Sequence, residues 1–205
     1  MMSKKLLAEF IGTFSLTFVV LLSSATDKFP IPTPVFAGLT LGLFVYFIGN
    51  ISGCHINPAV TLGLLSIKKI EVSEAVRYII AQVAGAILAL MVMNTLGADV
   101  TGQSFLKSKY VFVGEIIGTA LFTFGIASVV LGKITSGIKG VIIGSSLLLG
   151  ASFAVMIGAP GFLNPAVALG TNSLTITTLL GPIIGSIVGM QLYKYLITDK
   201  SSQKK

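Results

Sequence analysis

The strongest candidates for a functional role in this sequence are two copies of one short motif that begins with Asn. Asn-Pro-Ala-Val occurs at residues 57–60 and again at 164–167. Asn is a preferred helix N-cap, Pro suits the first helical position because its missing N–H needs no partner there, and Ala permits close packing. Each copy therefore predicts the start of a helix with an amide side chain at its positive end. The motif residues are Asn57, Pro58, Ala59, Asn164, Pro165 and Ala166.

The chemistry that such a pair offers is hydrogen-bond donation in a region of positive potential. If the two helix N-termini face each other, their dipoles and the amides of Asn57 and Asn164 gather at one place. The preceding segments, 52–56 and 158–163, are rich in Gly and other small residues and lack a helical pattern. Their carbonyl groups can line a water-filled path as acceptors. A narrow path of this kind favours dipolar solutes and repels cations, protons included.

The elements that position these motifs are read from the apolar runs. The 205 residues are 54% hydrophobic and 10% charged, whereas soluble domains carry about 25% charged residues. This composition excludes a soluble globular domain. A transmembrane helix takes about 20 mostly apolar residues. The sequence predicts six such spans, at 5–23, 35–51, 76–96, 111–131, 138–157 and 174–197.

The Asn-Pro-Ala segments are apolar but too short to cross a bilayer. Residues 58–67 and 165–172 would be about 15 Å long as helix, which predicts re-entrant half-helices. The chain also repeats itself, because 8–13 resembles 114–119. Since each half has three spans, an odd number, the second copy enters from the opposite side of the membrane. We therefore expect an all-α membrane protein with six transmembrane helices and two re-entrant half-helices in an inverted repeat (about 5–97 and 110–197), within one channel domain, 1–205.

The net charge of +7 is a topology signal and does not indicate a nucleic-acid site. Eleven of the 14 Lys and Arg residues lie at the termini or in two alternate connections. By the positive-inside rule, this places both termini in the cytoplasm and predicts a multi-pass protein of the cell membrane. A signal peptide over 1–22 is the other reading of the N-terminus, but it lacks a small-residue cleavage site. The three remaining basic residues are Lys28, Lys107 and Lys109.

The sequence resembles the aquaporin and glycerol-facilitator (major intrinsic protein) family. The resemblance rests on residues 52–61, on 164–166 and on the two repeats that contain Glu, and it covers nearly the whole chain. It implies one pore in each subunit, a homotetramer, and passive conduction of water or small uncharged solutes with no cofactor. Asn57 and Asn164 then take the role of the family's central pore asparagines.

The sequence departs from the family at the outer constriction. Members usually follow the second motif with Arg, where this chain has Val167. Counting from the asparagines places the other three filter positions at Ala37, Ser152 and Gly161. All four are small or apolar, so we expect a wider, less polar filter without a fixed charge. The alternative is that a nearby aromatic ring, of Phe36, Phe153 or Phe162, narrows it.

Titratable residues near the motifs have two readings each. Glu9 and Glu115 lie inside spans at equivalent positions of the repeat. A carboxylate there could couple proton movement to transport, but its presence in both halves favours a structural role that holds the half-helix loops. His55 could gate by protonation, or brace the first loop as a neutral donor and acceptor. Cys54 is either a thiol on the path or a small buried residue.

The sequence offers no basis for an enzyme. The single His has no Ser or Asp at a recognised spacing, no phosphate loop is present, and one Cys with one His leaves no multi-ligand metal site. An ion- or proton-coupled secondary transporter is the alternative function, because it also uses inverted repeats with broken helices. We expect a passive channel in the lipid bilayer for water and small neutral solutes of glycerol, ammonia or urea size, which excludes ions and protons.

Overall fold

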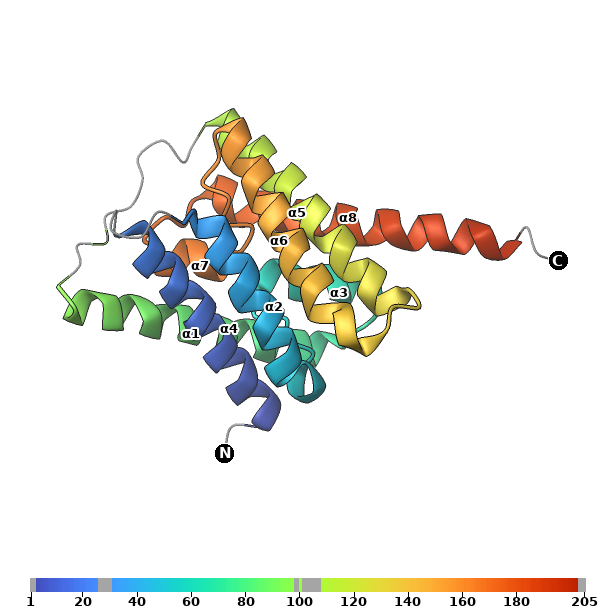
Figure 1. Cartoon of the computed structure of the whole chain (residues 1–205), viewed down its shortest axis with the longest axis horizontal. Helices are drawn as coiled ribbons and strands as arrows, with labels where there is room; N and C mark the ends of the chain where they lie inside the picture. Colours follow the sequence, from blue (N-terminus) through green and yellow to red (C-terminus); the bar gives the residue numbers. More distant parts are fainter. Residues whose placement is uncertain (1–2, 26–30, 98–99, 101–107, 203–205) are drawn as a thin grey trace.

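The computed structural model describes residues 3–25, 31–97, 100 and 108–202, and within them the chain is helical (Figure 1). Six of the helices in these ranges are long and apolar enough to cross a bilayer, and α3 and α7 are short, as predicted. Lys28 and Lys107 of the charge argument lie outside the described residues, as do Lys204 and Lys205. The elements are α1 Lys4–Ser24, α2 Thr33–Ser52, α3 Pro58–Ser66, α4 Val72–Thr95, α5 Lys109–Leu131, the 3₁₀ turn η1 Ser136–Ile138, α6 Lys139–Ile157, α7 Pro165–Gly170 and α8 Ile176–Ser202.

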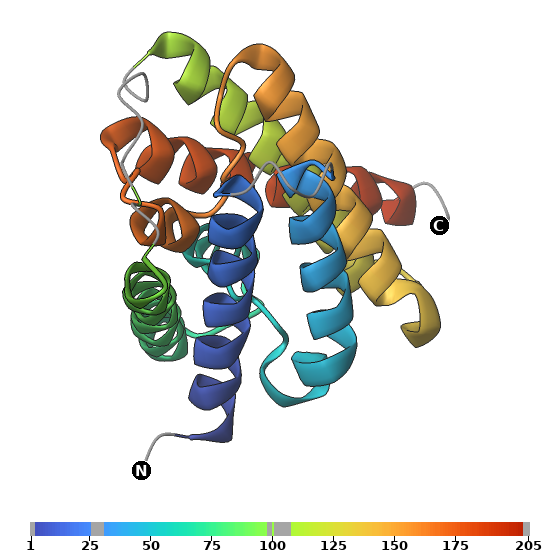
Figure 2. The ribbon, with the colours of Figure 1, turned by 60° about the vertical axis from the view of Figure 1, so that its left-hand side comes forward.

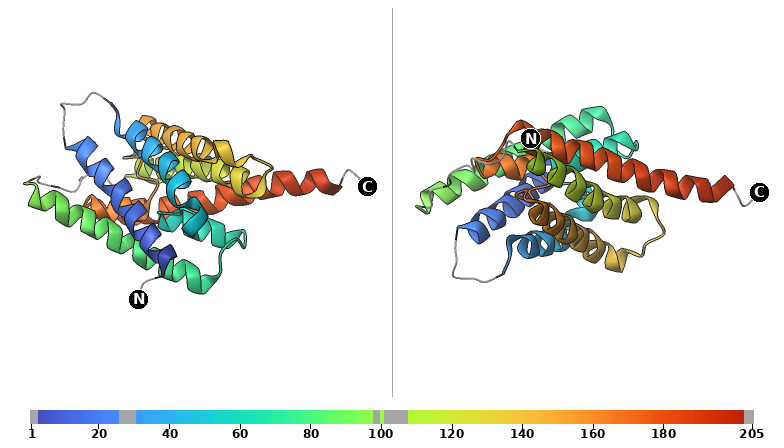
Figure 3. Two further views of the ribbon diagram at one scale, coloured as in Figure 1. Left: turned by 60° about the horizontal axis from the view of Figure 1, so that its bottom comes forward. Right: turned by 90° about the horizontal axis from the view of Figure 1, so that it is seen from above.

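The helices pack as two equivalent groups around the short pair. Helix α1 contacts α2 and α4, while α5 makes the equivalent contacts with α6 and α8. Helix α2 packs against α6 and joins the two groups (Figure 1). Figure 2 shows α3 and α7 close together inside the group of long helices, and the views in Figure 3 show α8 continuing past the rest of the bundle.

Two glycines at matching positions allow close contacts between these helices. A Cβ atom on Gly85 would overlap the carbonyl oxygen of Phe10, and one on Gly185 would overlap that of Ile116. The α1–α4 and α5–α8 pairs therefore approach at equivalent points of the repeat. Small residues allow this approach, and the resulting van der Waals contact stabilises helix pairs in a membrane, where apolar burial provides little driving force.

The two short helices share the same capping motif at their N-termini and the same capping motif at their C-termini. Asn57 and Asn164 are the N-caps, and each is followed by Pro at the first helical position. At the other end, Lys68 (φ +62°) and Asn172 (φ +52°) adopt the left-handed conformation. The next residue in each copy donates its backbone N–H back into the last turn, from Lys69 to the carbonyl of Leu64 and from Ser173 to that of Ala168. This is the Schellman motif, which satisfies carbonyls at a helix end.

The motif also corrects one predicted boundary. The second short helix was expected to run to residue 172, but α7 ends at Gly170. Thr171 is its C-cap, and a residue at φ +52° such as Asn172 cannot continue a right-handed helix.

Candidate functional site

The two asparagines that cap α3 and α7 meet at the centre of the molecule. The Oδ1 of Asn57 accepts the backbone N–H of Ala59 at 2.8 Å, and the Oδ1 of Asn164 accepts that of Ala166 at 3.0 Å. Each amide nitrogen donates to the opposite repeat, from Asn57 to the carbonyl of Leu163 at 2.8 Å and from Asn164 to that of Ile56 at 3.0 Å. An amide NH₂ has two hydrogens, so each asparagine retains a second donor hydrogen beside this bond.

The loops that precede the asparagines hold an unusual backbone. Cys54 (φ +53°), Ile56 (φ +40°) and Leu163 (φ +51°) lie in the left-handed region that side chains with a Cβ disfavour. A residue of this kind costs about 1–3 kcal/mol and persists only where its surroundings fix it. Ile56 and Leu163 are also the residues whose carbonyls accept the asparagine amides. Contacts elsewhere in the chain must therefore hold these two peptide groups.

Glu9 holds the first loop from within α1. Its Oε1 accepts the Ser52 hydroxyl at 2.6 Å and the backbone N–H of His55 at 2.9 Å. Its Oε2 accepts the backbone N–H of Ile56 at 2.6 Å and the side-chain amide of Gln82 at 2.8 Å. The carboxylate is fully buried, and hydrogen bonds to an ionised group are about twice as strong as neutral ones.

Glu115 makes the equivalent contacts in the second repeat. Its two oxygens accept the backbone N–H groups of Phe162 at 3.0 Å and Leu163 at 2.8 Å. The arrangement is therefore crossed. Glu9 fixes Ile56, which binds Asn164, and Glu115 fixes Leu163, which binds Asn57.

His55 lies beside this network. Its Nδ1 is 3.2 Å from the hydroxyl of Thr61, and its ring meets that of Tyr78 edge-on, with 5.0 Å between centroids. The Tyr78 hydroxyl donates to the carbonyl of Ser52 at 2.8 Å. These contacts tie the first loop to α3 and α4.

Sequence reasoning missed two polar partners of Glu9. Gln82 donates to Glu9 and, at 3.0 Å, to the Thr61 hydroxyl, so it links α4 to the half-helix. The available signal was an amide inside the apolar run 76–96. The role of the Ser52 hydroxyl has no sequence signal of its own, because Ser at a helix end is common.

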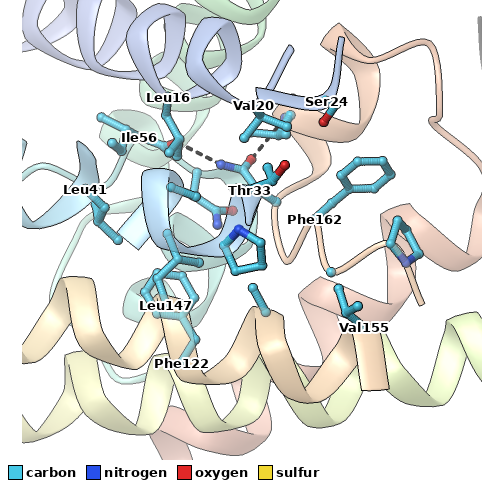
Figure 4. Close-up of a pocket in the computed structure, with 18 of the residues that line it drawn as sticks. Leu16, Val20, Ser24, Thr33, Leu41, Ile56, Phe122, Leu147, Val155 and Phe162 are labelled. Carbon is cyan, nitrogen blue, oxygen red and sulfur yellow. Dashed lines mark hydrogen bonds between the residues drawn. The ribbon is translucent and has the colours of Figure 1, made fainter. Parts of the chain in front are cut away.

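A series of cavities passes the asparagines. The outer cavity is about 270 Å³ and is lined by both asparagines and by Ala37, Gly161 and Val167 (Figure 4). The next, about 210 Å³, includes Cys54, and the inner cavity is about 430 Å³. Neighbouring cavities share lining residues, so they lie in sequence along one path. The first two share Leu41, His55 and Phe122, and the second two share Gly53, Val130 and Ile143.

The expected filter position at Ser152 is wrong. Ser152 is not among the residues that line the cavity, and its hydroxyl donates to the carbonyl of Leu148 within α6 at 2.8 Å. The residues of α6 that line it are Leu147, Ala151 and Val155, spaced by one helical turn. Counting back from Asn164 crosses the irregular loop 158–163, and an error of one residue rotates a helical side chain by about 100°.

Of the three phenylalanines named as alternatives, Phe162 lines the outer cavity. Its ring lies near Thr33 and Ser24 at the mouth (Figure 4). Phe36 and Phe153 are not among the lining residues, and Phe153 is 40% exposed. The cavity that precedes the paired amides is therefore mostly apolar, and the Phe162 ring lies at its mouth.

The fold and the path together define a membrane channel in which two half-helices from an inverted repeat meet at the centre. The family model for the major intrinsic proteins matches residues 1–193. The chain is 31% identical to aquaporin AqpM of Methanothermobacter marburgensis, over 97% of this chain and 99% of the relative. It is also 31% identical to a probable glycerol uptake facilitator protein of Thermotoga maritima, over 78% of this chain and 81% of the relative.

The fold matches a solved structure as well. The X-ray structure of the aquaglyceroporin from Plasmodium falciparum superposes with a TM-score of 0.72 and 24% identity, covering 95% of this chain and 96% of that one. The chain belongs to the major intrinsic protein family. It is a passive transmembrane channel of the water and small-solute class, and it is not an enzyme.

Proposed function

We propose that this channel conducts small neutral solutes of glycerol, urea or ammonia size together with water. The observation that carries this proposal is the outer mouth, where Ala37, Gly161 and Val167 line the cavity and none of the lining residues that the structure describes is an Asp, Glu, Lys or Arg. The small side chains at this mouth leave room for a solute with a carbon skeleton. The solute then regains hydrogen bonds at the loop carbonyls and the asparagine amides. The similarity to a probable glycerol uptake facilitator supports the same solute class.

The central donors in this proposal are Asn57 and Asn164. Their second amide hydrogens face a solute, while Glu9, Glu115 and His55 keep the loops in place. A solute oxygen that accepts from these amides replaces part of the hydration that it loses on entry. The positive ends of α3 and α7 repel cations at the same point.

The test is paired stopped-flow swelling of proteoliposomes in water and glycerol gradients. Val167→Arg adds a charge and bulk at the mouth and should reduce glycerol flux more than water flux. If the narrowed mouth strips hydration from the solute at a net cost of about 1–3 kcal/mol, the solute flux falls roughly 5- to 150-fold. Ala37→Phe narrows the mouth without charge, and Val167→Leu is the matched control that adds little bulk.

Two results would contradict the proposal. A parent that conducts water but excludes glycerol, urea and ammonia shows that Phe162 already closes the mouth, and Phe162→Ala would then admit glycerol. A glycerol flux that neither Val167→Arg nor Ala37→Phe reduces shows that the filter lies elsewhere.

For assembly and orientation, we propose a homotetramer in the cell membrane with a pore in each subunit and both termini in the cytoplasm. Large apolar side chains on the surface of α2 support a partner or lipid there, since Leu39 is 61% and Phe47 63% exposed. The placement of basic residues supports the orientation. Native mass spectrometry from bilayer discs and protease access to terminal tags test these two points, and a monomer or an external tag would contradict them.

A further inference from the structure

The charged side chains that the structure describes along the path all lie at one end. Among the described residues that line the three cavities, the charged side chains are Lys69 in the middle cavity and Lys139 in the inner one, and none is acidic. The outer cavity has Val167 beside the second motif. The fixed positive charge of this path therefore lies on the inner side of the asparagines.

The end of α3 places Lys69 at this position. Lys68 takes the left-handed conformation, and the backbone N–H of Lys69 donates to the carbonyl of Leu64 at 2.9 Å. The equivalent residue at the end of α7 is Ser173, whose hydroxyl donates to the carbonyl of Thr171 at 3.0 Å. The same Schellman motif thus presents a cation at the inner end and an uncharged, internally bonded side chain at the outer end.

Lys139 lies at the start of α6, in a turn whose backbone is bound by Tyr46. It is the first residue of α6, where the helix dipole disfavours a positive charge. The hydroxyl of Tyr46 in α2 pins this turn, since it donates to the carbonyl of Gly137 at 2.8 Å and accepts the N–H of Val141 at 3.3 Å. Lys139 is half-buried. The ion pair found within the described part of the chain joins Lys5 to Glu74 and involves neither path lysine.

We infer that Lys69 and Lys139 form a cation barrier at the inner mouth, in place of a charge at the outer filter. The inference rests on the proposed solute path. A neutral solute passes two ammonium groups with little change in energy, whereas a proton or metal cation is repelled. If each solvated ammonium group lowers cation flux about threefold, the pair lowers it about tenfold.

The experiment measures proton and glycerol flux on the same reconstituted channel. Vesicles containing pyranine report proton entry driven by a potassium gradient with valinomycin, and light scattering reports glycerol. The Lys69→Gln, Lys139→Gln double variant should raise the ratio of proton to glycerol flux about tenfold in dilute buffer. The increase should shrink in 1 M salt, where the Debye length is about 3 Å.

Two controls separate a local barrier from general surface charge. Lys133→Gln removes an exposed charge from the same connection as Lys139 without touching the cavities, and it should leave the ratio near that of the parent. The double Lys→Arg variant preserves both charges and should also keep the parent ratio. If the double Gln variant matches Lys133→Gln, or if the Arg variant leaks as the Gln variant does, the inference is wrong. An absence of glycerol flux in the parent would instead contradict the proposed function.

Discussion

Replacing Glu9 by Gln tests the crossed network most directly. The change keeps the shape of the side chain but turns one acceptor oxygen into a donor. Each Glu9 oxygen accepts one backbone N–H, that of His55 or that of Ile56. The Ser52 hydroxyl can rotate, and the Gln82 amide can turn because its Oε1 has no partner. A backbone N–H cannot adapt, so either orientation of the introduced amide leaves one buried N–H unpaired.

The size of the effect follows from these bonds. An unpaired buried donor costs about 1–3 kcal/mol, and losing charge assistance on the remaining bonds costs about 1 kcal/mol more. We expect Glu9→Gln to lower the free energy of unfolding by about 2–4 kcal/mol, measured by SDS titration with circular dichroism. Glu74→Gln, which breaks the surface pair with the 54%-exposed Lys5, is the matched control and should cost about 0–1 kcal/mol.

A double-mutant cycle extends this prediction to the pore. Glu9 and Asn164 bind the same residue, Ile56, through its N–H and its carbonyl. Their substitutions Glu9→Gln and Asn164→Ala should therefore couple by about 0.5–3 kcal/mol. Strict additivity, or a loss below about 0.5 kcal/mol for Glu9→Gln alone, would refute the idea that the carboxylate fixes the loop.

Two further changes have defined outcomes. Asn57→Ala removes an N-cap, worth about 0.5–2 kcal/mol, and also the hydrogen bond to the carbonyl of Leu163. The swelling rates in glycerol and in water gradients should both fall. Rates equal to those of the parent would exclude Asn57 as a pore donor. Gly85→Ala places a methyl group against the carbonyl of Phe10 and should lower the free energy of unfolding by about 1–3 kcal/mol in the same SDS titration. The control Gly137→Ala has open space around its Cβ and should lower it by less than about 0.5 kcal/mol. Equal losses of stability in the two variants would contradict the close approach of α1 and α4.

The sequence predicts the architecture well because its signals are local and duplicated. Six apolar runs and two Asn-Pro pairs define the elements, and the recurrence of Glu9 as Glu115 points to a shared structural role. Side-chain direction is harder to predict across irregular backbone. The loop 158–163 contains left-handed residues at Gly158, Gly161 and Leu163, so counting through it misplaced the filter position at Ser152.

Local sequence patterns also fail to predict hydrogen-bond partners that are distant in the sequence. Gln82 lies 73 residues from Glu9, and nothing in its neighbourhood in the sequence indicates a buried carboxylate. The second repeat has Pro182 near the corresponding place, so the repeat itself gave no hint of an amide. Lys69 is a second example. The sequence explains it as a basic residue of a connection predicted to be cytoplasmic, whereas the structure places it at the end of α3, where it lines the middle cavity.

The crossed asparagine bonds have a consequence for how the chain is made. Asn57 and the carbonyl that its amide binds are separated by 106 residues, and Asn164 and its acceptor by 108. During synthesis, the first repeat emerges with the Asn57 amide and the Ile56 carbonyl unpaired at membrane depth, where an unsatisfied polar group is costly. These polar groups of the first repeat must therefore stay hydrated until α7 inserts from the other side and the two crossed hydrogen bonds form. A ribosome that stops after the first repeat would release a chain whose central polar groups lack the partners that the second repeat supplies.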